Sequence, residues 1–327
     1  ESGSDEVTEL QLFLETIHTL RSRTFTVNPG IALYQVTGRT VAVEPRLRLT
    51  ARPRLSYGTH RFSIAAGVYH QGVVGLNDER DVGNVFTVWT PAADTLDLPS
   101  AVHVVAGWAG RFSGGLGASV EAFVKDFREL SVPQFSPFPS FTTALQPADG
   151  TAIGADLRVE LHDRPFLAGS TFDGYVSYSY ADVEYQTATF DYNPAQHRRH
   201  QVNVVAHTEK DGLGITVQWQ YGTGFPFTAS AGFDEFQILT PTTDVSTQPG
   251  VTRVLYDRPF GRRQPPYERI DVWLDRESTI GRARLTLRAG IINLFNRDNL
   301  FYFDLFTLRR VDQMPLIPSV GVKVELL

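Results

Sequence analysis

A strict alternation of apolar and polar residues runs through most of this chain and limits what it can fold into. From Arg284 to Ile291 the even positions read Arg, Thr, Arg, Gly and the odd ones read Leu, Leu, Ala, Ile. The same alternation recurs in LGASVEAFVK, AIGADLRVEL, QVNVVAH, LGITVQWQY and SVGVKVELL. Because successive side chains of a β-strand point to opposite faces, this period predicts an all-β protein with two chemically different strand faces.

The alternation predicts about thirteen strands joined by two kinds of connection. The strands are expected near residues 7–18, 24–35, 44–57, 60–71, 101–112, 115–130, 151–163, 170–186, 198–209, 213–222, 267–277, 282–294 and 316–327. Short turns such as YGTH, FSGG and KDG alternate with longer segments, the longest at 72–99, 131–150 and 223–265. Short turns at one end and long loops at the other are typical of an antiparallel transmembrane β-barrel.

A soluble β-sandwich also alternates, and charged residues help to choose between the two folds. Six charged residues recur on the polar faces of the expected strands: Arg158, Glu160, Asp271, Asp275, Arg284 and Arg288. Such charges would be costly in the dry core of a sandwich but are ordinary in a water-filled barrel. We therefore expect Leu285, Leu287 and Ile291 to face lipid, and Arg284, Thr286 and Arg288 to face the barrel interior.

Composition excludes several classes of function. The formal net charge is −6, so no basic field indicates a nucleic-acid partner. Without cysteine the chain has no disulfide, thiolate metal site or cysteine nucleophile. No run approaches the ~20 apolar residues of a membrane helix. The single methionine is Met314, so Glu1 is not a translation start, and we expect a processed chain or a piece of a longer one.

A search for catalytic and metal-binding patterns predicts no enzyme, no cofactor and no metal site. His197 and His200 lie three residues apart, which on a strand places them on opposite faces; a polar loop entering a strand explains them. The glycines of GRFSGGLG lack the strand-to-helix context of a phosphate loop, and no Gly-x-Ser-x-Gly elbow occurs. The DERD run at 78–81 has two interpretations, a ligand contact or a solvated loop with internal ion pairs.

The tail PPYERIDVWLDRESTIGRARLTLRAGIINLFNRDN…IPSVGVKVELL resembles the C-terminal end of TonB-dependent outer-membrane receptors. In that family a Tyr-x-x-hydrophobic-Asp strand precedes a strand that ends in Asn-Leu-Phe-Asn or Asn-Leu-Phe-Asp. The matching positions are Tyr267, Ile270 and Asp271, followed by Asn293, Leu294, Phe295 and Asn296. Upstream segments such as RPRLSYGTHRFSIAAGVYHQ and YGTGFPFT are similar too, so the resemblance covers most of the chain. A departure is Leu327, where outer-membrane barrels usually end in an aromatic residue.

The resemblance implies a location in the outer membrane and a role in ligand uptake powered by an inner-membrane complex. Receptors of this family have a barrel of 22 strands around an N-terminal plug. Residues 1–327 would then be the C-terminal part of the barrel, with no second domain, the plug and about nine strands lying outside this sequence. The implied partners are outer-membrane lipid, a TonB-type energy-coupling protein and a small ligand, with a surface lipoprotein as a further candidate. The ligand class stays open among siderophore, cobalamin, glycan and peptide; the alternatives are a passive porin or a structural barrel.

The three longest loops are expected to carry recognition. Candidate ligand contacts are Asp78, Arg80, Trp89, Phe135, Phe225 and Phe227. The aromatic rings among them would stack on a sugar or a catechol, or would pack loop against loop. The NLFN motif is expected to be structural, ending its strand at the outer rim where asparagine side chains bond freed backbone groups.

Overall fold

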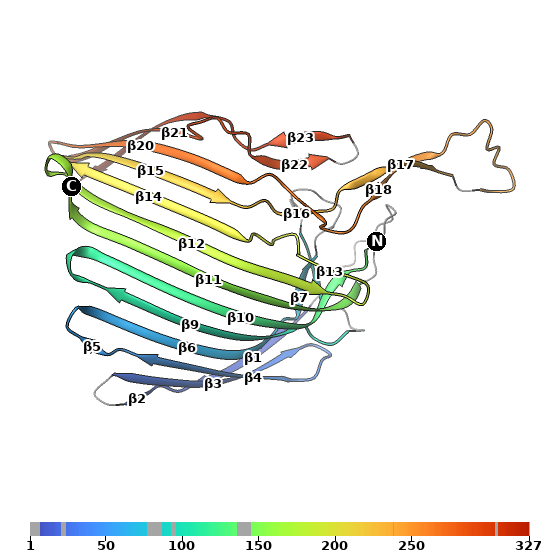
Figure 1. Ribbon diagram of the computed structural model, residues 1–327, viewed down its shortest axis with the longest axis horizontal. Coiled ribbons are helices and arrows are strands. Elements are labelled where there is room, and N and C mark those ends of the chain that lie inside the picture. The colour runs from blue at the N-terminus through green and yellow to red at the C-terminus, as the bar shows by residue number, and fades with distance from the viewer. Residues whose placement is uncertain are drawn as a thin grey trace.

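A computed structural model describes residues 7–20, 24–76, 87–92, 96–135, 145–237, 239–304 and 307–326. Thirteen strands form the continuous path of one antiparallel sheet. Figure 1 shows how this sheet runs through the molecule. The thirteen strands are β1 (Glu9–Glu15), β3 (Phe25–Val36), β4 (Ala42–Ala51), β6 (Gly58–His70), β9 (Ser100–Arg111), β10 (Leu116–Pro133), β11 (Leu145–Pro165), β12 (Thr171–Gln186), β14 (His200–Lys210), β15 (Leu213–Gly222), β20 (Tyr267–Ile280), β21 (Ala283–Ile292) and β24 (Ile317–Leu326). Each overlaps one expected strand, so the antiparallel all-β fold and the strand count are confirmed.

Shorter strands either pair with strands of this sheet or form separate two-stranded sheets in the connections. β2 (His18–Leu20), β5 (Arg54–Leu55) and β13 (Asp191–Tyr192) pair with β3, β6 and β12. Four separate two-stranded pairings lie in the connections and were not expected from the sequence. They are β7 (Val73–Leu76) with β8 (Val88–Pro91), β16 (Pro226–Phe227) with β19 (Arg262–Arg263), β17 (Ser230–Phe236) with β18 (Val251–Tyr256), and β22 (Leu300–Asp304) with β23 (Arg309–Asp312).

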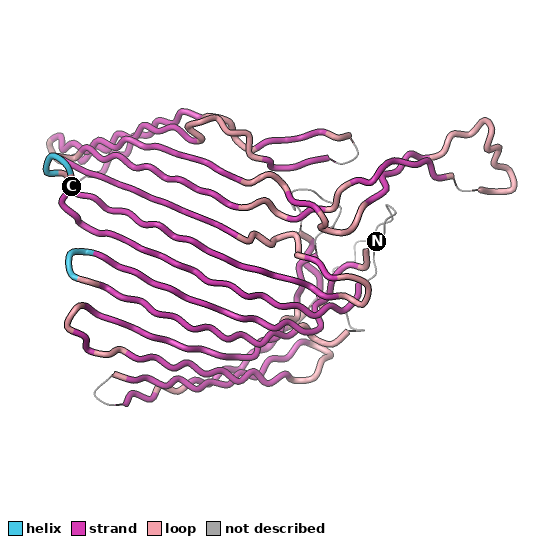
Figure 2. The backbone as a smooth tube through the Cα atoms, viewed as in Figure 1, coloured by secondary structure: helices cyan, strands magenta, loops and turns pink. Residues whose placement is uncertain are grey.

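The short turns gather at one end of the sheet and the long connections at the other. Within the described ranges, helical residues occur only in two short turns at the first end, η1 (Ser113–Gly115) and η2 (Leu167–Gly169), coloured cyan in Figure 2. The turn between β14 and β15 has positive φ at both Asp211 and Gly212, as a two-residue hairpin requires. β24 ends at this short-turn end, and β1 begins at the opposite, loop end (Figure 1).

No helix in the described ranges is long and apolar enough to cross a membrane.

The connection expected at 131–150 is shorter than predicted. β10 continues to Pro133 and β11 begins at Leu145, so paired strand replaces much of that loop. A β-bulge makes this possible, because the register shifts between Phe127 and Leu130 and pairing then resumes. Glu129 within the bulge takes a positive φ of 55°. Alternation breaks at a bulge, which is why the period-two pattern ended the strand too early.

Strand register separates an apolar face from a polar face, as expected. One row on the apolar face runs across six neighbouring strands: Phe62, Trp108, Val120, Leu157, Tyr178 and Val202. The next row, one residue along, lies on the other face: Ser63, Gly107, Glu121, Asp156, Ser179 and Gln201. Likewise Leu285 and Leu287 pair with Val324 and Val322, while Arg284 pairs with Glu325.

Buried apolar residues are concentrated at the loop end of the sheet. Among them are Ala32, Tyr34 and Val36 of β3 and Val74 of β7. Gly72 fits tightly here, because a Cβ on it would lie 2.6 Å from Val36 and 2.7 Å from the Tyr34 hydroxyl. Segment 71–76 therefore packs against β3. The large apolar side chains of the outer strand face stay exposed, as Leu157 and Ile64 illustrate.

The sheet has two edges, β1 and β24, within the described part of the chain. Neighbouring strands alternate in direction, so the first and the last of thirteen run the same way. These two edges cannot pair with each other in an antiparallel ladder.

Candidate ligand-binding site

A cavity of about 440 Å³ lies at the loop end of the sheet, and we call it the loop-end pocket. Its walls come from β7 and β8, the ends of β10 and β12, segment 187–199 between β12 and β14, and the turn at 258–261. Six aromatic side chains line it: Trp89, Phe135, Tyr185, Phe190, Tyr192 and Phe260. The pocket is therefore assembled from segments that lie far apart in the sequence.

Tyr192 is the centre of the aromatic lining. Its ring centroid lies 5.8 Å from that of Tyr185, 5.5 Å from that of Phe190 and 5.3 Å from that of Phe260. The contact with Phe260 is stacked, with 19° between the rings, and Phe190 also contacts Phe135 at 6.3 Å. These spacings fall in the range of stabilising aromatic pairs, so the rings support one another.

Further ring contacts connect the pocket with the polar face of the sheet. Tyr185 lies 6.4 Å from Phe127, Phe127 lies 6.3 Å from His103, and His103 lies 4.7 Å from Tyr69. Tyr69 and Phe127 pair with the same residue of β9, Ala101, so the register places them on one face. A series of rings thus runs from the polar face of the wall to the loop-end pocket.

The described residues that line the pocket are all uncharged. Apart from its aromatic residues, the polar side chains are Gln71, Thr87, Ser131 and Gln196, and no described lining residue is acidic or basic. Gln196 Nε2 donates to the Tyr185 hydroxyl at 3.4 Å, and Gln71 Nε2 donates to the Val73 carbonyl at 2.5 Å. The Ser131 hydroxyl is buried and has no hydrogen-bond partner among the residues that the structure describes.

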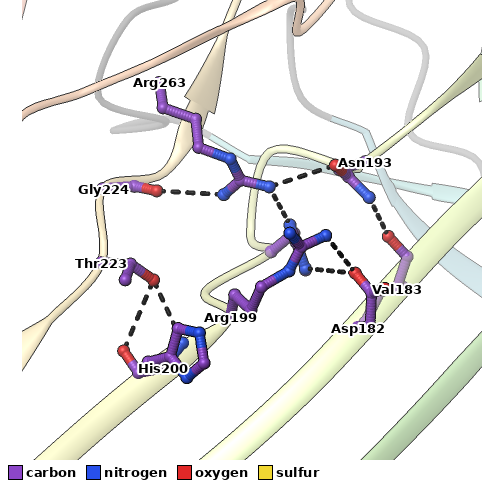
Figure 3. A network of polar contacts seen from close by, with 9 residues as sticks. Asp182, Val183, Asn193, Arg199, His200, Thr223, Gly224 and Arg263 are labelled. Carbon is purple, nitrogen blue, oxygen red and sulfur yellow. Dashed lines mark hydrogen bonds and ion pairs between the residues drawn. The ribbon is translucent and has the colours of Figure 1, made fainter.

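Two arginines fix segment 187–199, which carries Phe190 and Tyr192. Arg263 donates to Asn193 Oδ1 at 3.1 Å, to His197 Nδ1 at 2.7 Å and to the Gly224 carbonyl at 3.2 Å (Figure 3). Arg258 donates to the Asp191 carbonyl at 2.6 Å. Because both arginines come from the 223–265 connection, they tie two loops together behind the pocket.

His197 is the buried centre of this network. Since Nδ1 accepts from Arg263, the ring proton sits on Nε2, which faces Asp182 Oδ1 at 3.3 Å. Arg199 donates to the same carboxylate oxygen at 2.7 Å. Burial, and next the Arg263 charge, lower the pKa of His197 below its ordinary value. The imidazole is therefore neutral at pH 7 and serves as a structural acceptor.

The ring of Phe260 is positioned by a tight turn. The Arg258 carbonyl accepts from the Gly261 N–H at 3.1 Å, with Pro259 second and Phe260 third in the turn. Phe260 has a positive φ of 51°, which this turn geometry needs at its third position. Its N–H donates to the buried hydroxyl of Thr228 at 3.0 Å. The strained backbone of Phe260 thus places its ring in the pocket.

The sequence-predicted contact residues divide into three groups. Trp89 and Phe135 both line the loop-end pocket. Phe225 and Phe227 do not line it: the Arg198 guanidinium lies 4.1 Å from the Phe225 ring centroid, and Phe227 pairs with Arg262 between β16 and β19. Asp78 and Arg80 lie outside the described residues.

Sequence reasoning missed the four other aromatic residues of the pocket, Tyr185, Phe190, Tyr192 and Phe260. The signal was present, because TFDYNP places two aromatics and a proline between two clearly alternating strands. It belongs to a connection shorter than the three that were selected by length.

Asn293 is the buried centre of the NLFN motif, for which the sequence predicts a structural role. Asn293 Nδ2 donates to the Arg297 carbonyl at 3.0 Å and to the Met314 carbonyl at 3.1 Å, and its Oδ1 accepts from the Arg297 N–H at 3.0 Å. Asn296 Oδ1 accepts from the Leu316 N–H at 2.8 Å. Both asparagines have positive φ, which this residue type tolerates better than most.

The other motif positions support the same strand end. Asp271 is buried, accepts from the Asn293 N–H at 2.8 Å and pairs with Arg269 at 2.9 Å. The Leu294 N–H donates to the Ile270 carbonyl at 2.7 Å, while the Phe295 side chain is 73% exposed. Tyr267 begins β20 and its hydroxyl lies 3.4 Å from Gln220 Oε1.

The sequence analysis did not select Asn299, although its side chain adds hydrogen bonds at the same strand end as Asn293. Its Oδ1 accepts from the Glu268 N–H and its Nδ2 donates to the Glu268 carbonyl, each at 2.9 Å. One side chain therefore imitates a strand partner for β20, where the backbone ladder has stopped.

No protein-family model matches this sequence, and no curated protein matches it either. Solved structures do match its fold over 97% of the chain. The outer-membrane transporter YddB from Escherichia coli matches with a TM-score of 0.65 at 11% identity, covering 45% of that chain. The ferripyoverdine receptor of Pseudomonas aeruginosa matches with a TM-score of 0.62 at 11% identity, and the match covers 38% of that chain. The FrpB iron transporter from Neisseria meningitidis matches with a TM-score of 0.58 at 14% identity, and the match covers 44% of that chain.

The chain therefore spans less than half the length of the proteins that it matches. Those proteins are TonB-dependent outer-membrane receptors, and the likeness is to the C-terminal part of their barrels. At this level of identity the match concerns the fold, which is the fold that the sequence resemblance implied.

Proposed function

We propose that this chain is the C-terminal part of the barrel of a TonB-dependent outer-membrane receptor that takes up a scarce small ligand. The observation that carries the proposal is the thirteen-strand wall, apolar on one face and polar on the other, which matches receptor barrels over 97% of the chain. In this assignment the apolar face contacts outer-membrane lipid, the polar face lines the interior and the long connections lie outside the cell.

Strand parity supports a barrel that is larger than this chain. β1 and β24 run in the same direction, so an antiparallel ring needs an odd number of additional strands between them. Nine more would give a 22-stranded wall, the size of plugged outer-membrane transporters. We place those strands and the plug in other parts of the full polypeptide.

The chain's own part in uptake is capture. External loops collect the ligand, and the loop-end pocket holds it through aromatic surfaces and uncharged polar groups before release into the barrel. The arginine contacts behind segment 187–199 keep the pocket formed in advance, which lowers the entropic cost of binding. Energy for release comes from the coupling protein acting through the plug.

A passive porin is the second candidate, because a polar interior face would also serve diffusion. The first test is the size of the native polypeptide, measured by immunoblotting outer-membrane fractions with an antibody raised to residues 223–265. We expect a band far above the 36.4 kDa of this chain. A band near that size would overturn the receptor assignment and lead to single-channel conductance measurements.

The second test is energy dependence. Cells that express the full protein should lose accumulation of the captured ligand when the proton gradient is collapsed, because active release needs the inner-membrane complex. Uptake that continues unchanged without the gradient would favour the porin.

A further inference from the structure

We propose that the loop-end pocket takes an uncharged, ring-shaped ligand, a neutral oligosaccharide, rather than an anionic iron chelate. This inference rests on the proposed function for its physiological role, and on the pocket alone for its chemistry. It selects one of the four ligand classes that the sequence left open.

The first argument is the charge of the lining. Anionic ligands lose hydration on entering a cavity, and a cationic side chain is the usual compensation for that loss. The described lining offers no cation, because its polar groups are neutral: the amides of Gln71 and Gln196, the indole N–H of Trp89, and the hydroxyls of Thr87, Ser131, Tyr185 and Tyr192. Two arginines close to Phe260 in the chain, Arg258 and Arg263, already donate to Asp191, Asn193 and His197.

The second argument is the shape of the apolar lining. A pyranose ring carries C–H groups on its faces and hydroxyls around its edge. Aromatic faces suit the C–H groups, and Tyr192 and Phe260 present such a stacked pair with centroids 5.3 Å apart. Side chains of this kind are rigid, so they lose little conformational entropy when a ligand binds.

The third argument concerns the hydroxyl edge of a sugar, which both donates and accepts hydrogen bonds. Amide side chains can do the same through one oxygen and two N–H groups. The side-chain amides of Gln71 and Gln196 each make one hydrogen bond in the described part of the protein, which leaves capacity for a ligand. Ser131 adds a buried hydroxyl without a described partner at the cavity wall, an arrangement that proteins seldom keep without a reason.

The size of the cavity agrees with a short ligand. Its volume of about 440 Å³ lies in the range of about 300–1,000 Å³ that is usual for small-molecule sites. A short oligosaccharide or the end of a longer glycan therefore fits, with the ring contacts through Phe127 and His103 leading inward.

The test is direct binding to the full protein, purified in detergent from outer membranes. An array of neutral and acidic glycans identifies a binder, and titration calorimetry then compares that glycan with a ferric tris-catecholate. Tyr192→Ala and Phe260→Ala should each weaken glycan binding about tenfold or more. The matched control is Phe166→Ala, which removes a half-exposed ring at the short-turn end and should leave binding unchanged.

Heat-modifiable migration on gels verifies that each variant is folded, and Ser131→Ala gives a milder second variant if Tyr192→Ala fails to fold. Binding of a neutral glycan that the pocket variants weaken and Phe166→Ala does not would support the proposal. Ferric tris-catecholate binding that the same variants weaken would overturn it while leaving the receptor assignment intact. Binding of acidic glycans only, or of no glycan, would overturn it as well, whereas failure of the receptor assignment shows separately in polypeptide size and energy dependence.

Discussion

Asn293 shows how one side chain can end a strand. It makes three hydrogen bonds to backbone groups that the β21 ladder no longer satisfies. Asn293→Ala should destabilise the protein by about 2 kcal/mol or more, because the buried amide of Asn293 and its three part-buried hydrogen bonds are lost. The measurement is the temperature at which heat-modifiable migration on gels is lost. Phe295→Ala, which truncates an exposed ring in the same motif, should behave like the wild type; an equal loss in both variants would contradict this account.

His197 makes the wall of the pocket sensitive to acid. Its pKa is lowered by burial and by Arg263, so the folded loop takes up a proton less readily than the released loop does. The neutral His197 imidazole therefore contributes fully to the stability of the folded loop above the ordinary histidine pKa of about 6.5. This contribution is lost as pH falls below that value. The charged groups that face the ring are Arg263, Asp182 and Arg199.

We accordingly expect hydrogen exchange in segment 187–199 to rise between pH 7.5 and pH 5, after correction for the intrinsic rate. His197→Gln should remove most of this rise, since glutamine can still accept from Arg263 but does not titrate in this range. The same rise in both proteins would show that another group is responsible.

At the residue scale the sequence predicted local chemistry better than long-range contacts. The NLFN asparagines bond groups within the same strand end or its immediate partner, so motif and geometry are linked directly. The pocket joins residues 89, 135, 192 and 260, whose meeting depends on how separate loops fold over the sheet. Trp89 and Phe135, which line the pocket, were selected because aromatic residues in long loops are conspicuous, whereas Tyr192 was not selected because its loop is short.

For whole elements, alternation predicted the strands because successive side chains of a pleated strand point to opposite faces of the sheet. It could not predict the bulge in β10 or the hairpin β17–β18, because side chains there do not alternate between a lipid-facing side and a polar interior side. That hairpin projects away from the sheet in Figure 1 and is held by paired contacts between Arg253 and Asp234 at 2.6 and 2.7 Å. Its side chains follow their own cross-strand pairing rather than the barrel pattern.

The separation of faces can be tested on two neighbouring strands. Leu157→Arg places a charge in the middle of the apolar face of β11 and should cost about 2–4 kcal/mol near the bilayer midplane. Ser179→Arg adds the same side chain to the polar face of β12, opposite Asp156, and should be tolerated. Urea unfolding in lipid vesicles measures both. Equal costs for the two variants would mean that the faces are assigned wrongly.

At the scale of the whole molecule, the two ends of the sheet should meet different compartments. Residues 1–327 contain no cysteine, so a single cysteine introduced here can be compared directly with the unsubstituted full protein as the background. Val245→Cys lies at the loop end and Leu167→Cys at the short-turn end, and both positions are well exposed. A membrane-impermeant maleimide should label the first in intact cells and the second only after lysis. The reverse result would invert the topology.

The two edges of the wall also bear on how such a protein can change over time. Inside a bilayer an unpaired row of backbone groups has no solvent to satisfy it, so the ring must stay closed through every alteration. In an antiparallel ring, losing or gaining one strand would bring two strands of like direction together. Size can therefore change only by whole hairpins, two strands at a time, whereas the outer connections are free to lengthen, shorten and diversify one residue at a time.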